Sequence, residues 1–84
     1  MQQYLFICRS VTFAQKMSRL LGSRGITADY ARAPKTLGLN GCAFMVRVSE
    51  RNYEAAVAEL TRARSMPGHI FFQSPGGGYV EVSN

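Results

Sequence analysis

Two short apolar segments, 4–8 (YLFIC) and 42–48 (CAFMVRV), constrain the fold of this chain more than any other feature. Nearly continuous apolar segments of this length are typical of strands that are buried on both faces of a sheet. We therefore expect both segments to be central strands. In the second one Cys42, Phe44 and Val46 share one face, because successive side chains of a strand alternate.

Two further segments have the spacing of amphipathic helices, with apolar side chains recurring every three to four residues. The expected apolar positions are Phe13 or Ala14, Met17, Leu20 and Leu21 in the first, and Tyr53, Ala56, Val57 and Leu60 in the second. The candidate caps and stops are Ser10 or Thr12 with Gly22 or Gly25 for the first helix, and Asn52 with Pro67-Gly68 for the second.

The rest of the chain reads as strands, turns and loops. We expect strands at 26–31, 69–73 and 79–82, a turn at 74–78 and a long loop at 32–41. The order is then strand, helix, strand, strand, helix, strand, with an extra strand at the C-terminal end. This order predicts a single α+β domain over residues 1–84, a ferredoxin-like split βαβ sandwich whose antiparallel sheet carries two helices on one face.

The charge of the chain first suggests an anionic partner. Ten Lys and Arg against five Asp and Glu give a net charge of +5 on 84 residues. The basic side chains are spread over both helices and the loops, however, and do not form one block. A ferredoxin-like RNA binder would use aromatic side chains of its central strands, here Tyr4, Phe6 and Phe44, but it would also carry a Lys/Arg-Gly-Phe motif that is missing. We therefore do not expect nucleic acid as a partner.

Composition also indicates where the chain works. With 46% hydrophobic residues it can bury a core, which excludes intrinsic disorder. No apolar run approaches the roughly 18 residues of a membrane span, so we expect no membrane partner. The segment MQQ at the start lacks the basic residues of a secretory signal, and a cytoplasmic location is therefore expected.

Signatures of enzymes are scarce. The single histidine, His69, has no acidic neighbour in the sequence, and the five acids are scattered along the chain. No P-loop, HExxH motif or dinucleotide fingerprint is present, and two cysteines are too few for a zinc cluster. We expect a non-catalytic protein that holds neither a cofactor nor a metal.

The two cysteines differ in setting. Cys8 closes an apolar strand, so we expect it to be a small core residue. Cys42 follows Gly41 at the junction between loop and strand, and the cations of Arg32 and Lys35 in the same loop would favour its thiolate. Cys42 also lies on the strand face of Phe44, as a first core residue would. The residues alone leave both roles of Cys42 open.

These residues also resemble a family of small bacterial domains described as selenium/sulfur carrier-like proteins. The resemblance covers residues 4–60 and rests on the helix at 12–21, the pair Pro34-Lys35 and the later Cys42. The family has Pro-Arg followed by Ser-Cys-Gly, where this chain has lysine and, after the cysteine, Ala43. The resemblance implies that Cys42 accepts sulfur or selenium as a persulfide or selenosulfide. It implies protein partners as well, namely the enzymes that donate and accept the atom.

Our leading hypothesis is therefore a carrier whose thiol is Cys42, with Arg32, Lys35 and Gly41 forming the binding site for the transferred atom. A second hypothesis is a regulatory or interaction module that binds a small ligand or forms a homo-oligomer. It rests on the sheet face that two helices leave uncovered, which would display large apolar side chains of the central strands.

Overall fold

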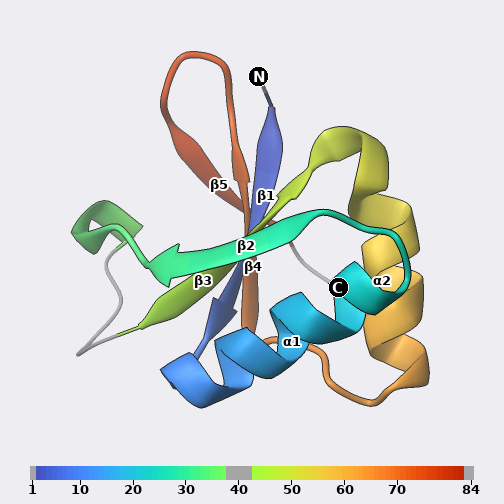
Figure 1. The fold of residues 1–84 in the computed structure, drawn as a ribbon. Coiled ribbons are helices and arrows are strands. Elements are labelled where there is room, and N and C mark those ends of the chain that lie inside the picture. Colours follow the sequence, from blue (N-terminus) through green and yellow to red (C-terminus); the bar gives the residue numbers. More distant parts are fainter. Residues whose placement is uncertain (1, 38–42, 83–84) are drawn as a thin grey trace.

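The computed structural model describes residues 2–37 and 43–82, and in that part of the chain one five-stranded sheet carries two α-helices (Figure 1). Along the chain the elements are β1 (Gln3–Cys8), α1 (Val11–Ser23), β2 (Ala28–Arg32), the 3₁₀ turn η1 (Lys35–Leu37), β3 (Phe44–Ser49), the 3₁₀ turn η2 (Glu50–Asn52), α2 (Tyr53–Arg62), β4 (His69–Gln73) and β5 (Tyr79–Val82). The strand order is β2-β3-β1-β4-β5, and all neighbouring strands are antiparallel. The predicted α+β split βαβ architecture is confirmed, with β5 as the extra strand.

Both ends of α1 follow local sequence signals. At its start the Ser10 side chain accepts a hydrogen bond of 3.2 Å from the Phe13 amide, which leaves Ser10 rather than Thr12 as the cap. At its end Gly25 has a φ of +80°, which an L side chain rarely adopts. This conformation lets the Ile26 amide donate to the Leu21 carbonyl at 2.9 Å and so terminates the helix.

The predicted ends of α2 are only partly right. The helix does begin after Asn52, but the Asn52 side chain makes no capping hydrogen bond, because η2 leads the backbone directly into the helix. The helix also ends at Arg62, well before Pro67-Gly68. Arg64 adopts a φ of +55°, and the Ser65 amide donates to the Leu60 carbonyl at 2.9 Å. Thus an arginine occupies a position that normally favours glycine.

Replacing Arg64 by glycine should therefore stabilise the protein. Relief of the left-handed conformation outweighs the added backbone entropy of the unfolded chain by about 0.5–1 kcal/mol, which corresponds to a rise of about 2–8 °C in Tm. Thermal unfolding followed by circular dichroism measures the change. Gly25→Ala is the matched control: a methyl group there has open space, but the positive φ should lower Tm. A lower Tm for Arg64→Gly would contradict the left-handed conformation of Arg64.

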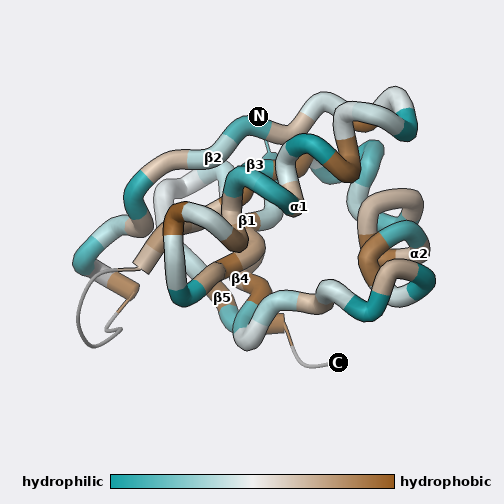
Figure 2. Tube along the Cα trace, turned by 60° about the horizontal axis from the view of Figure 1, so that its bottom comes forward, coloured by the Kyte–Doolittle hydropathy of each residue, from teal (hydrophilic) through white to brown (hydrophobic). Residues whose placement is uncertain are grey.

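The main core lies between the sheet and the two helices. Phe6, Val46 and Ile70 from the sheet are fully buried there against Leu21 of α1 and Leu60 of α2. The helices keep their polar positions outward, and Figure 2 shows hydrophilic and hydrophobic positions alternating along both of them. The two helices therefore cover one face of the sheet, as the apolar spacing predicts.

All three aromatic side chains considered for RNA stacking belong to this helix-facing layer. Tyr4 stacks on Tyr53 of α2 with ring centroids 3.8 Å apart, Phe6 is fully buried, and Phe44 packs against the same core. None of the three is on the sheet face away from the helices, the face on which a ferredoxin-like fold would stack bases.

That opposite face carries its own apolar cluster, which we call the second-face cluster: Leu5, Ile7, Met45 and Phe71. Its members are buried, from 1% exposed for Leu5 to 9% for Phe71. The residues packed against it are Ala31, Ala33, Leu37, Ala43 and Tyr79. The expectation that this face displays large apolar side chains is wrong for these residues, because η1 and β5 contribute side chains that cover them.

Polar pairs occupy the remainder of the second face. The Gln3 amide Nε2 donates to Gln73 Oε1 at 2.6 Å, and Arg47 forms an ion pair with Asp29 on the neighbouring strand. Cross-strand pairs of this kind add modest stability at the surface. The second face is thus divided into a buried apolar part and a polar part.

Candidate functional site

The residues predicted to bind the transferred atom come from the end of the β2–β3 ladder. Arg32 is the last residue of β2 and lies opposite Phe44, the first residue of β3. One further backbone bond, from the Ala33 amide to the Ala43 carbonyl at 2.9 Å, continues the pairing beyond both strands. Ala43 is the residue that follows Cys42 in the sequence. Cys42 and Gly41 themselves lie outside the described residues.

Lys35 begins the 3₁₀ turn η1, which the sequence does not predict within the expected loop. The Leu37 amide donates to the Pro34 carbonyl at 3.3 Å and closes the turn. Leu37 packs against the second-face cluster, so an apolar side chain anchors η1 to the sheet. Lys35 itself is exposed on this anchored turn.

The charged side chains at this end of the sheet are positive. Arg32 and Lys35 are exposed, and neither makes an ion pair among residues 2–37 and 43–82. The guanidinium carbon of Arg32 lies 5.8 Å from the centroid of the Phe44 ring, so the Arg32 side chain reaches over the first residue of β3. The sequence has no Asp or Glu from position 30 to position 49. Such a surface favours an anion over a cation.

Cys8 is the buried thiol that the sequence predicts. Its side chain is 1% exposed, and its Sγ is 3.7 Å from the Phe6 carbonyl oxygen, to which the thiol donates. Burial raises the pKa of the Cys8 thiol from 9.0 to about 11, because the thiolate would lose its hydration. Cys8 is therefore neither accessible nor ionised near neutral pH, and its assignment to the core is confirmed.

His69 acquires a partner that sequence reasoning missed. Its Nδ1 lies 2.6 Å from Oε2 of Glu81 across the β4–β5 hairpin. The register of the hairpin, which the glycine-rich turn 74–78 sets, is the signal that could have paired them. Both side chains are about half exposed, 50% and 53%, so solvent weakens the pair and we assign it a surface role.

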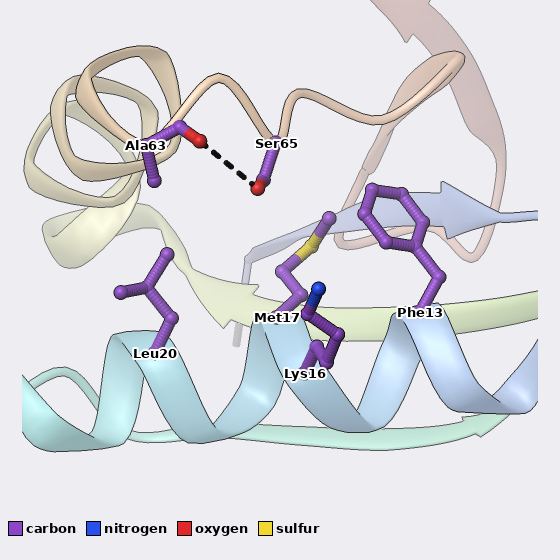
Figure 3. Close-up of a pocket in the computed structure, with 6 residues that line it drawn as sticks. All are labelled: Phe13, Lys16, Met17, Leu20, Ala63 and Ser65. Carbon is purple, nitrogen blue, oxygen red and sulfur yellow. Dashed lines mark hydrogen bonds between the residues drawn. The ribbon is translucent and has the colours of Figure 1, made fainter.

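The structure also has a pocket of about 220 Å³ on the helical side, which the sequence does not predict. Four of its lining residues, Phe13, Lys16, Met17 and Leu20, come from one face of α1 (Figure 3). Ala63 and Ser65, just after α2, line the other side, where the Ser65 hydroxyl donates to the Ala63 carbonyl at 3.3 Å. The sequence shows that the four α1 residues share one face of a helix, but it does not show that the end of α2 lies beside that face.

Comparisons with known proteins do not assign this chain to a family: no protein-family model, no curated protein and no solved structure matches it. The resemblance to selenium/sulfur carrier-like domains consequently stays a prediction, which rests on the segment 12–21, Pro34-Lys35 and Cys42. Within residues 2–37 and 43–82, neither helix has the length and apolar character needed to cross a membrane.

Proposed function

We propose that this chain is a non-catalytic sulfur or selenium carrier of the cytoplasm, in which the Cys42 thiol accepts the atom from one protein partner and delivers it to another. The observation that carries the proposal is the pair of exposed cations, Arg32 and Lys35, on β2 and η1, the two elements that precede Cys42 in the chain. Neither cation makes an ion pair among residues 2–37 and 43–82. The burial of Cys8 supports it, because that thiol is unavailable for transfer.

The transfer is a thiolate exchange that needs no oxidant. The Cys42 thiolate attacks the terminal sulfur of a donor persulfide, R–S–SH, and a new S–S bond forms as the donor S–S bond breaks. The products are Cys42–S–SH and the donor thiolate R–S⁻, so the electron pair leaves with the donor sulfur and the proton stays on the transferred one. Selenium would give the selenosulfide Cys42–S–SeH in the same way.

Arg32 and Lys35 have the same task in this reaction. The Cys42 thiolate and the anionic persulfide that forms on it carry negative charge, which neighbouring cations stabilise. Because Arg32 is positioned by the Phe44 ring and Lys35 by a turn anchored through Leu37, both charges stay at this end of the sheet. Gly41, which precedes Cys42, completes the predicted binding site.

Labelling with iodoacetamide at neutral pH tests the proposal. Trypsin cleaves after Arg9, Lys35 and Arg47, so each thiol lies in its own peptide for mass spectrometry. Cys42 should react faster in the native protein than in urea at the same pH, and Lys35→Met should slow it by about two- to fivefold, since one exposed charge is removed. A persulfide donor should add the mass of one sulfur atom to the Cys42 peptide.

Lys16→Met is the matched control, because it removes the same charge from α1 and should leave the labelling rate unchanged. The carrier function would be refuted if Cys42 reacted no faster in the native protein than in urea, or reacted only after unfolding. Equal rates for Lys35→Met and Lys16→Met would remove Lys35 from the site.

The alternative module retains one observation in its favour. The pocket beside α1, which is far in sequence from Cys42, supports the version of this hypothesis in which the module binds a small ligand. Sedimentation of the wild type and of Cys42→Ser tests its oligomeric form: a dimer that is indifferent to the substitution favours the module over the carrier.

A further inference from the structure

We propose that the pocket between α1 and the end of α2 binds a small amphiphilic anion, an aliphatic monocarboxylate whose chain fills the pocket and whose carboxylate meets Lys16. This site is separate from the proposed carrier thiol. Its lining comes from residues 13–20 and 63–65, whereas the carrier site involves residues 32–42.

The walls of the pocket select the body of the ligand. Figure 3 shows Phe13 and Leu20 at its two ends, with Met17 between them, all rising from α1. Ala63 lines the opposite wall. At about 30 Å³ for each water-sized group, 220 Å³ accommodates an apolar body of about seven such groups. An unbranched aliphatic chain meets this requirement.

Charge at the rim selects the head group. Lys16 lines the pocket, and the exposed Arg19 and Arg64 flank lining residues in the sequence. None of these three cations makes an ion pair within the described part of the chain. The nearby acid, Glu59, is already held by Arg24 at 3.3 Å and Arg62 at 3.2 Å. The rim is consequently complementary to an anion.

The end of α2 offers a competing partner for Lys16, because helix C-termini attract cations. Three of the last four carbonyls of α2 are already satisfied, however. Those of Glu59, Leu60 and Thr61 accept backbone amides of residues 63–65, and that of Ala63 accepts the Ser65 hydroxyl. Among the described residues Lys16 forms no hydrogen bond to them. The ammonium group remains available for a carboxylate, with which it would form a charge-assisted bond.

Calorimetric titration with octanoate tests the proposal, with octylammonium and octan-1-ol as probes of the same chain length. Saturable binding of octanoate is expected, with octylammonium bound more weakly. Lys16→Met keeps an unbranched side chain that is one atom shorter but removes its charge, and should weaken octanoate binding about tenfold. Ala63→Leu should abolish octanoate binding, because the larger side chain fills the pocket. The variant should still fold, since Ala63 is exposed and its right-handed backbone conformation is open to any L side chain.

Lys35→Met is the matched control and should bind octanoate as the wild type does. The proposal is overturned if octanoate shows no saturable binding at millimolar concentration, if Lys16→Met and Lys35→Met bind equally, or if octylammonium binds as tightly as octanoate. A failure here leaves the iodoacetamide result at Cys42 untouched, so the two proposals fail separately.

Discussion

Replacing Leu5 by alanine should lower the free energy of unfolding by about 2–5 kcal/mol, although Leu5 lies on the sheet face opposite the helices. The side chain is 1% exposed and packs with Ile7, Met45 and Phe71, so its removal leaves a cavity in a closed cluster. Equilibrium unfolding in urea measures the change. Leu60→Ala, on the helix-facing side, should cost a similar amount because Leu60 is fully buried.

Val80→Ala provides the reference for an open position. Val80 is 61% exposed, and its truncation should change the free energy of unfolding by no more than about 0.5 kcal/mol. If Leu5→Ala cost as little as Val80→Ala, the second face would be open, and the burial of the second-face cluster would be wrong.

In a Cys42→Ser protein, Cys8 should react with iodoacetamide at least about a thousandfold more slowly in the native state than in urea. Burial hides the sulfur, and a pKa of about 11 leaves little thiolate near neutral pH. Reaction then requires opening of the core, which costs about 5 kcal/mol or more in a stable domain. A time course by mass spectrometry at one pH, with and without urea, measures the ratio.

The Cys42→Ser background leaves Cys8 as the sole thiol, so the rate has one source. The protein that carries both Cys8→Ala and Cys42→Ser has no thiol and serves as the control for background labelling. Native-state labelling of Cys8 within a factor of ten of the rate in urea would show that β1 is not closed on its helix-facing side, and would return Cys8 to the candidates for the transferring thiol.

Much of the fold could be predicted because its signals are local. The apolar segment 4–8 marks β1, Ser10 marks the start of α1, and Gly25 marks its end. Each depends on the conformational preference or hydrogen bonding of a few adjacent residues. The end of α2 could not be predicted in this way, because Arg64 adopts a left-handed conformation that arginine disfavours.

The candidate site was predictable only as residue types. The sequence alone identifies two cations near a cysteine, and it separates Cys8 in an apolar strand from Cys42 beside a loop. The anchoring of Lys35 by Leu37 and the orientation of Arg32 by Phe44 needed the structure, because they depend on contacts across strands. The pocket beside α1 also needed the structure, because it depends on the end of α2 lying next to α1.

By itself, then, the sequence determined the order of elements, the α+β class and the core position of Cys8, since periodicity and capping act over a few residues. The apolar segments 4–8 and 42–48 already predict strands that are buried on both faces, but only the tertiary structure decided what covers the face of the sheet opposite the helices. Helices cover one face, while η1 and β5 contribute the cover of the other. Burial on the second face depends on which distant segments meet there, and no local pattern carries that information.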